Sequence, residues 1–476
     1  MRKLYWYVSA YIAKYGKTLL FSLCVALLVF WVFLPRMLTM MRTLNKEYVG
    51  VVGQYTLPDL PLFVKEEISA GLTIIEPNGS VSPLLAERWS VEQDGTMYRF
   101  ILKENIRWQD GELVEPDDIN YRFNDVETIT TLGDIVFKLP DTFAPFPAAV
   151  AEPILKVSQE RSLLFRTRYT FVGIGKNSIT QYKTHDGVLD ELTIEKPEQS
   201  TVYRFYQTEQ DAMTAFKRGE VDTLKDLSRT YDIMDWPTTT TTVTNSYQQY
   251  VALFFDNANP LFQKNIRQGL AYALSVPENK TPAYSPISPS SWGYLKSVKQ
   301  YNQDVPRAIE RLLDQVPGEP LNLEITTTTQ FAADAERIKT EWEAMGDQAV
   351  SACQSTSNVE DKDLCQNLDI TVTIRISNFP DTNNFSILLL GQEIPSDPDQ
   401  YHLWHSGQNT NFTHYKNTRI DSILEKARKT SDQKERQELY YEFQQFFSED
   451  VPVIFLYYLD SYSVERSAHT IDQNDT

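Results

Sequence analysis

Few side chains in this sequence have the types and spacing that chemistry requires. Three of its five histidines, His402, His405 and His414, fall within 13 residues and would suit a zinc site, although we favour ordinary polar contacts for them. Asp397 and Asp399 suggest acid–base work, but Asp-Pro-Asp is more typical of a turn at a cleft edge. The sequence has no Gly-x-Ser-x-Gly or His-Glu-x-x-His motif. We therefore predict a protein that is not an enzyme and has no metal and no cofactor.

The three cysteines divide into two groups. Cys353 and Cys365 stand twelve residues apart in a polar stretch, and outside the cytoplasm a disulfide between them is favoured, with two free thiols as the alternative. Closing a loop of that size contributes roughly 3 kcal/mol in the chain-entropy model. Cys24 lies in an apolar run and lacks the small preceding residue of a lipid-attachment site.

That apolar run, Thr18 to Leu34, has 17 residues with no charge, proline or glycine. As a helix it would span roughly 25 Å at about 1.5 Å per residue, close to the thinnest hydrocarbon core that a helix crosses. Four basic residues precede it and three follow it, which predicts a cytoplasmic segment at 1–17, a transmembrane anchor at 18–34 and a linker at 35–47. A cleaved signal peptide is the alternative, but no small-x-small cleavage pattern follows the run.

Length and charge limit the remaining possibilities. A chain of 476 residues predicts two or three structural units. Its net charge of -19 is uneven, since the first 46 residues carry seven basic and no acidic groups, which leaves 38 basic and 64 acidic residues in the remainder. Such an acidic surface repels phosphate backbones, so we exclude nucleic acid as a partner.

Local patterns in the body of the chain predict alternating strands and helices. Residues 96–102 alternate apolar and polar side chains and, with the stretch at Trp89, predict a hairpin. Pro-Asp-Asp at 116–118 predicts the start of a helix that carries Ile119 and Phe123 on one side.

The same alternation continues to the C-terminus. We expect strands at 47–57, 238–242, 251–257, 321–329, 368–376 and 453–459, and helices around 208–219, 266–273, 335–346, 420–427 and 432–446. Repeated β–α alternation predicts lobes of the α/β class.

Two blocks of the sequence resemble one known family. Residues 84–123 read LLAERWSVEQDGTMYRFILKENIRWQDGELVEPDDINYRF, which closely resembles the signature of the extracytoplasmic solute-binding proteins of peptide-type ABC importers, called family 5. Residues 396–464 resemble the end region of that family, from Asp-Pro-Asp through two helices to a closing Pro-Val-Ile strand. The resemblance covers roughly residues 48–466.

The resemblance implies a two-lobed α/β fold of the periplasmic-binding-protein type, class II-like, with an extra small domain inserted in lobe I. With the predicted N-terminal transmembrane helix in front, we expect lobe I to comprise residues 48–75, 170–250 and 440–468. We expect the small inserted domain at 76–169 and lobe II at 251–439.

The resemblance also implies ligand-binding residues in a cleft between the lobes. Trp292 falls in a stretch similar to one near the ligand, and Phe254 to Asn259 matches a segment that we expect to form a hinge and cleft wall. Peptide-binding relatives carry an Ala-Asp-Tyr run whose acid meets the ligand ammonium, and the matching residue here is Ile394. Glu393 and Asp397 are the candidates to replace that acid. The complete set of predicted ligand-binding residues is Asp256, Asn257, Trp292, Glu393, Asp397, Tyr401 and Trp404.

The leading hypothesis is a membrane-anchored substrate-binding subunit of an ABC importer for peptides or similar polar solutes. The expected partners are the ligand, ABC permease and ATPase subunits, and the membrane through the N-terminal helix, with the protein itself a monomer. We expect a single-pass protein of the cell membrane with an extracytoplasmic body. The alternatives are an anchored peptide-binding sensor or chaperone-like protein without a transport role and, less favoured, an anchored hydrolase.

Overall fold

The computed structural model describes residues 14, 15, 17, 30, 46–57, 59–161, 167–356 and 362–467. The predicted transmembrane anchor, residues 18–34, lies outside the described residues apart from Phe30. No helix among those described combines the length and the apolar character needed to cross a membrane.

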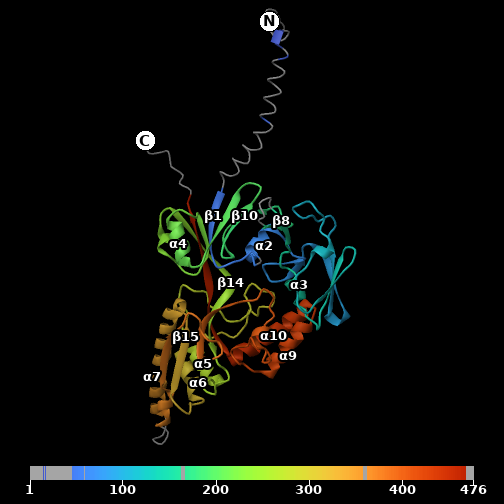
Figure 1. Cartoon of the computed structure of the whole chain (residues 1–476). Coiled ribbons are helices and arrows are strands. Elements are labelled where there is room, and N and C mark those ends of the chain that lie inside the picture. The colour runs from blue at the N-terminus through green and yellow to red at the C-terminus, as the bar shows by residue number, and fades with distance from the viewer. Residues whose placement is uncertain are drawn as a thin grey trace, which may run out of the picture.

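One mixed sheet of ten strands runs through both lobes of the molecule (Figure 1). In lobe I its order is β10 (Ser178–His185), β11 (Val188–Glu195), β12 (Ser200–Tyr206), β1 (Lys46–Val52) and β13 (Thr223–Leu227). It continues through β18 (Val453–Arg466) and β14 (Thr239–Phe255) into β17 (Ile387–Glu393), β15 (Leu321–Thr327) and β16 (Ile370–Ile376) of lobe II. The predicted α/β lobes are therefore halves of one continuous sheet.

Strands β14 and β18 connect the lobes. They pair from Thr239 to Asn245, and again from Tyr250 to Phe254, with an irregularity between the two ladders. Tyr247 lies in this gap with a φ of 51°, in the left-handed region that side chains disfavour. We call residues 245–250 the crossover. Phe254, the first residue of the predicted hinge at Phe254 to Asn259, is 1% exposed and paired with β17 and β18 inside lobe II, so the predicted hinge lies outside the crossover.

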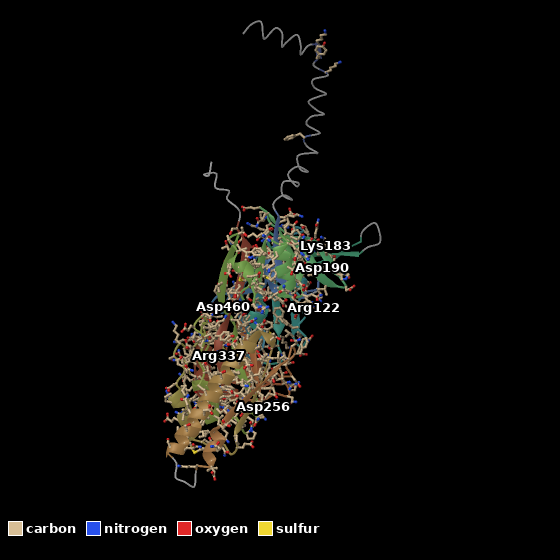
Figure 2. The ribbon with its side chains drawn as sticks, turned by 90° about the vertical axis from the view of Figure 1, so that its left-hand side faces the viewer. Arg122, Lys183, Asp190, Asp256, Arg337 and Asp460 are labelled. Carbon is tan, nitrogen blue, oxygen red and sulfur yellow. A yellow bond between two sulfur atoms is a disulfide. The ribbon has the colours of Figure 1, made fainter. Side chains whose placement is uncertain are left out.

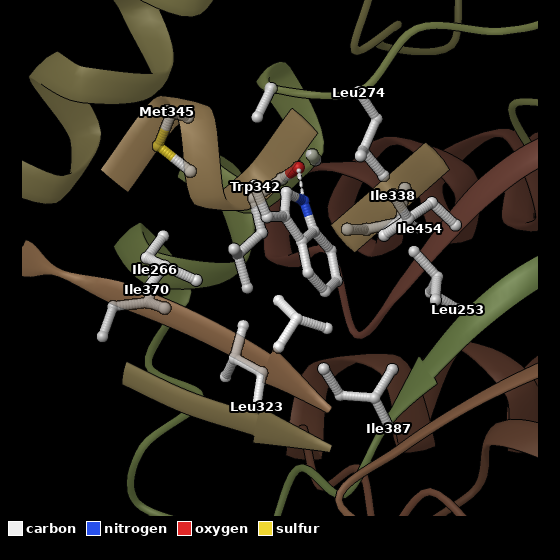
Figure 3. Close-up of a cluster of buried hydrophobic side chains, with 14 of the residues drawn as sticks. Leu253, Ile266, Leu274, Leu323, Ile338, Trp342, Met345, Ile370, Ile387 and Ile454 are labelled. Carbon is white, nitrogen blue, oxygen red and sulfur yellow. Dashed lines mark hydrogen bonds between the residues drawn. The ribbon is translucent and has the colours of Figure 1, made fainter. Parts of the chain in front are cut away.

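Helices cover both faces of the sheet in lobe II. Helices α5 (Lys264–Tyr272), α6 (Val305–Leu313) and α7 (Ala332–Thr356) pack on one face around the buried Trp342, whose indole N–H donates to the carbonyl of Leu270 at 2.9 Å (Figure 3). Helices α9 (Thr418–Lys429) and α10 (Gln433–Asp450) pack on the other face with the short α8 (Tyr401–Trp404). The predicted domain boundary at 439/440 therefore falls inside α10, a helix of lobe II.

Capping and periodicity explain why the last helices form where the sequence predicts them. Ile420, Ile423, Leu424 and Ala427 recur at helical spacing, and all four are buried. The carboxylate of Asp432 accepts the amide of Glu435 at 2.9 Å and so caps α10.

Lobe I and the small domain are built from shorter elements. Helix α2 (Leu62–Ile68) and helix α4 (Glu209–Lys217) cover opposite faces of the lobe I sheet. The small domain has a four-stranded sheet in the order β4 (Ala86–Glu92), β5 (Met97–Leu102), β7 (Asp134–Lys138) and β6 (Glu127–Thr130). It also has the pair β2 (Thr73–Ile75) and β3 (Val81–Pro83), the helix α3 (Phe146–Ala149), and a following hairpin of β8 (Lys156–Arg161) and β9 (Thr167–Val172).

The predicted hairpin at 89–102 is confirmed, but the predicted helix after Pro116 is not. Pro116–Asp118 forms one 3-10 turn, and Ile119 continues as extended chain with φ −91° and ψ 107°. The Asp118 carboxylate accepts the indole N–H of Trp108 at 3.0 Å and the amide of Glu115 at 2.9 Å, which fixes the turn. Ile119 is buried in the small-domain core without further helix.

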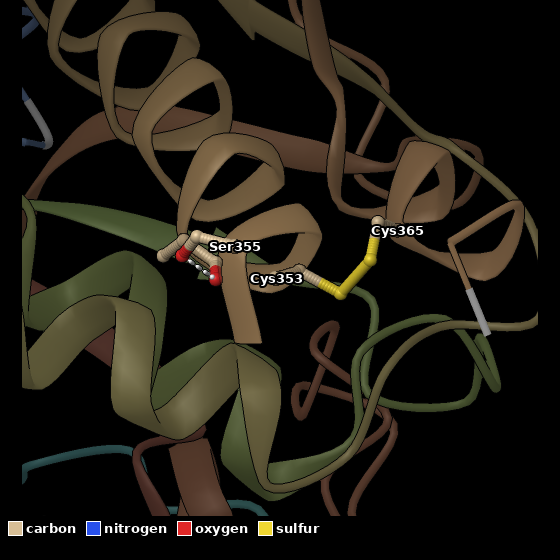
Figure 4. Close-up of a disulfide and its surroundings, with 4 residues drawn as sticks. Cys353, Ser355 and Cys365 are labelled. Carbon is tan, nitrogen blue, oxygen red and sulfur yellow. Dashed lines mark hydrogen bonds between the residues drawn. A yellow bond between two sulfur atoms is a disulfide. The ribbon is translucent and has the colours of Figure 1, made fainter. Parts of the chain in front are cut away.

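The disulfide lies at the end of lobe II. Cys353, near the end of α7, is bonded to Cys365 in a 3-10 turn (Leu364–Leu368), as Figure 4 shows. It ties the end of α7, the longest of the described helices, to the segment that leads into β16.

Candidate functional site

A pocket of about 540 Å³ lies between the two lobes beside the crossover. Lobe I contributes the end of β13 and lobe II the residues that follow β15, so the carboxyl ends of strands from both lobes meet there. In open α/β sheets this is where ligands bind. The polar and aromatic residues that line the pocket are Asp226 and Ser228 of lobe I, Thr328, Gln330 and Phe331 of lobe II, and Gln248, Gln249, Asp460 and Ser461 of the connecting strands.

Hydrogen bonds hold the polar groups of the pocket in place. The hydroxyl of Ser461 donates to Asp226 at 2.9 Å and so links β18 to the end of β13. The amide of Gln249 donates to Glu393 at 3.5 Å between paired residues of β14 and β17. Asp460 forms an ion pair with Lys280 at 3.1 Å, and their side chains are 12% and 21% exposed. These groups can hydrogen-bond a polar ligand from both lobes.

The floor of the pocket is apolar. Phe331 and Leu459 line it next to Gly391, where a Cβ would lie 3.3 Å from Leu459 and 3.5 Å from Phe331. A larger side chain at this position would therefore project into the pocket.

The small domain contacts lobe II at two places. The backbone and indole N–H groups of Trp292 donate to the carbonyls of Asn78 at 2.8 Å and Gly79 at 3.1 Å. The guanidinium of Arg428 stacks over Phe143 at 4.8 Å and over Tyr401 at 4.3 Å, beside a cavity of about 480 Å³. These contacts join the small domain to lobe II without passing through the crossover.

Asp397 forms a buried ion pair within lobe II. Its two carboxylate oxygens lie 2.7 and 3.3 Å from Arg436, and the two side chains are 12% and 7% exposed. Arg436 also donates to the hydroxyl of Tyr440 at 2.9 Å. Burial raises the pKa of the Asp397 carboxyl, although the guanidinium beside it acts in the opposite direction. The pair positions α10 against the loop that follows β17.

The structure does not bring the predicted ligand-binding residues together. Glu393 accepts a hydrogen bond from Gln249, which lines the interlobe pocket, but does not line the pocket itself, whereas Trp292 and Tyr401 lie at the small-domain contacts. Asp397 is engaged by Arg436. Trp404 is 2% exposed in the lobe II core and stacks on Phe254.

Asp256 and Asn257 are remote from the pocket. They follow Gln249 by seven residues or more, about 23 Å along an extended strand. Figure 2 places Asp256 far below Asp460. Asp256 lies 2.9 Å from the Nδ1 of His414, and the side-chain amide of Asn257 donates to three backbone carbonyls. Both side chains therefore lie at the end of β14 and not among the residues that line the interlobe pocket.

The residues that sequence reasoning missed share one signal. Asp226, Thr328 and Gln330 stand at or directly after the carboxyl ends of β13 and β15. The strand at 321–329 was predicted, so the residues that follow it were available as candidates. The order of the strands in the sheet, which shows that these two ends meet, could not be predicted from the sequence.

The histidines hold ordinary polar contacts. His402 lies 3.0 Å from Arg428, and His405 lies 3.0 Å from Glu425. Within the described ranges, no group of three or more His, Cys, Asp or Glu side chains is arranged to hold a metal ion.

Comparison with known proteins decides the family. The model of the bacterial extracellular solute-binding proteins, family 5 (Middle), matches residues 80–396. The chain belongs to family 5. This confirms the predicted family, and family 5 proteins are non-enzymatic binding proteins with an extracellular body.

Two curated Bacillus subtilis (strain 168) proteins are similar to this family 5 chain. The oligopeptide-binding protein AppA is 21% identical over 469 residues, which cover 86% of this chain and 85% of AppA. The dipeptide-binding protein DppE is 21% identical, with 84% and 82% covered.

Solved structures share the fold. CtaP from Listeria monocytogenes, a substrate-binding protein of an ABC transporter, superposes with a TM-score of 0.69 at 19% identity, covering 89% of this chain and 94% of CtaP. NikZ from Campylobacter jejuni, in complex with Ni(L-His), gives a TM-score of 0.65 at 19% identity, with 88% and 94% covered. The two-lobed α/β architecture is therefore that of family 5.

Proposed function

We propose that this protein is the substrate-binding subunit of an ABC importer and captures peptides or similarly sized polar solutes in the interlobe pocket. The observation that carries the proposal is this pocket, which is lined from both lobes at the carboxyl ends of their strands and lies beside the only two strands that the described sheet shares between lobes. Relatives support the class of ligand, since one solved AppA structure contains a nonapeptide and NikZ contains a nickel–histidine complex.

Native mass spectrometry of the purified protein tests ligand capture. We expect a retained ligand that dissociates when Gly391 is replaced by leucine, because the longer side chain enters the pocket floor. Gly318→Leu is the matched control, since a Cβ at Gly318 meets nothing within 4 Å. Equal retention by both variants would place the ligand elsewhere and refute the pocket assignment.

The proposal includes delivery to a permease and attachment to the membrane through residues 18–34. The full chain should co-purify with two permease and two ATPase subunits, and a clean absence of these partners would favour a sensor or chaperone-like role. Deletion of residues 1–45 should leave a folded, ligand-binding protein that no longer fractionates with membranes. A truncated protein that cannot fold would show that the apolar run belongs to the core.

A further inference from the structure

Another cavity, of about 190 Å³, lies within lobe II and shares no lining residue with the interlobe pocket. We call it the lobe II cavity. It lies where the two hydrophobic clusters of the lobe meet. Leu274 and Ile454 come from the cluster around Trp342, at whose edge they lie (Figure 3). Phe447 and Val453 come from the cluster on the face of α9 and α10.

The cavity exists because one edge of β18 is only partly covered in lobe II. Residues 281–283 pair with that edge, where the amide of Ala283 donates to the carbonyl of Leu456 at 3.2 Å. Towards the start of the strand, at 453–455, no described segment pairs with the same edge. Protein interiors have few voids larger than a water molecule. A space of this size inside a folded lobe is therefore a candidate for a ligand site.

Apolar side chains form most of the cavity wall, and its polar side chains already have partners. Each of these polar side chains makes a hydrogen bond or an ion pair with another protein group, and Lys299 is paired with Glu449. Among the described residues that line the cavity, none has a buried polar side-chain atom without a partner. A water molecule needs polar partners, so such a cavity favours an apolar occupant. The polar lining residues are Ser275, Tyr284, Lys299, Tyr301, Asn302, Gln303 and Ser448.

The cavity has a buried end and an end towards solvent. Ala271, Leu274 and Val451 are buried, whereas Asn302 and Gln303 are exposed. All lining residues belong to lobe II or to the lobe II end of β18. A small molecule can therefore reach the cavity from the side of Asn302 and Gln303 without any separation of the two lobes.

We propose that the lobe II cavity is a second ligand site, for a small uncharged molecule with an apolar body such as an aromatic ring system. At about 190 Å³ it is somewhat larger than an engineered apolar cavity of about 150 Å³ that binds benzene. A charged ligand of the same size would lose its hydration and find no unpaired charge in return. The site is independent of the interlobe pocket and its ligand.

Three probes of similar size test the preference for an uncharged ligand. They are indole, which is uncharged, and benzoate and benzylammonium, each titrated calorimetrically into the purified full chain. We expect indole to bind with a Kd of about 0.1 mM, at least about tenfold tighter than either charged probe. At ten times its Kd, indole should raise Tm by about 4 °C.

Variants of lining residues locate the bound indole. Ala283→Leu extends a buried side chain into the cavity and should weaken indole binding about tenfold. Val276→Phe, at a half-buried lining position, is the second blocking variant should the first not fold. Ala333→Leu, exposed on α7, is the matched control. Gly391→Leu, which alters the interlobe pocket, should leave indole binding unchanged.

Equal affinity for the three probes, absence of indole binding, or indole binding that neither blocking variant weakens would overturn the inference. Loss of indole binding in Gly391→Leu would also overturn it, because indole would then occupy the interlobe pocket. The two sites share no lining residue, so failure of the proposed function would leave the result for the lobe II cavity unaffected.

Discussion

Replacing Asp397 by asparagine should destabilise lobe II and leave ligand binding intact. The asparagine would keep the shape of the side chain but not the charge, and Arg436 would remain buried, at 7% exposure, without its carboxylate. Removing one member of a buried ion pair costs about 3–5 kcal/mol. Because Arg436 keeps its hydrogen bond to Tyr440, we expect the lower end, about 3 kcal/mol.

The expected loss is large enough to measure by thermal unfolding. For a unit of the size of lobe II, about 3 kcal/mol lowers Tm by roughly 6–12 °C. The double variant Asp397→Asn/Arg436→Met should recover most of this loss, because it removes the unpaired charge and keeps the volume. Asp347→Asn, on the exposed face of α7, is the control and should leave Tm unchanged.

Ligand titration separates the structural role from a role in binding. Affinity in the Asp397→Asn variant should remain within about twofold of wild type, because Asp397 does not line the interlobe pocket. A large loss of affinity with an unchanged Tm would refute the reasoning and return Asp397 to the ligand site.

Three further predictions concern contacts elsewhere in the fold. Trp292→Phe removes the indole N–H that donates to Gly79 and should lower the stability of this contact by about 1 kcal/mol. Amide hydrogen exchange should therefore become faster at residues 78–80 but not in β5. Unchanged exchange at residues 78–80 would contradict the proposed contact. Cys353→Ser removes the disulfide and should lower the free energy of unfolding by about 3 kcal/mol. Dithiothreitol should lower the Tm of wild type but not that of the variant. Equal Tm shifts in the two proteins would contradict a stabilising role of the disulfide. Burial alone would raise the pKa of Asp450, but hydrogen bonds from Tyr415, Asn417 and Lys264 outweigh burial and lower it. The charged Asp450 carboxylate therefore stabilises the fold at pH values above its unfolded pKa of about 4, and this stabilisation is lost as the pH falls through the lower folded pKa. The difference in Tm between wild type and Asp450→Asn should therefore narrow from pH 6 to pH 2. A difference that stays constant with pH would contradict this.

Elements with a local signal were predictable from the sequence. The alternation at 96–102 and the apolar stripe from Ile420 to Ala427 carry their own burial pattern, and the structure buries the predicted side chains. Pro-Asp-Asp at 116–118 also has a helix-start signal, but its acids bind neighbours in a single turn and the following residues pack as extended chain. There, tertiary contacts decided the outcome.

The site was harder to predict because it is non-local. Asp226 and Gly391 are far apart in the sequence, and they line one pocket only because β18 and β14 stand between β13 and β17 in the sheet. The resemblance implies a ligand-binding role for Asp256, whereas in the structure β14 passes the interlobe pocket at Gln249 and Asp256 follows the end of that strand.

The last long strand sets the order in which the molecule can be completed. β18 pairs with β13 in one half of the sheet and with β14 in both halves. A nascent chain that ends before Val453 therefore lacks a central strand of each half. We expect emerging chains to remain unfinished until their final residues have left the translocation machinery, which makes folding slow and dependent on protection from aggregation during export.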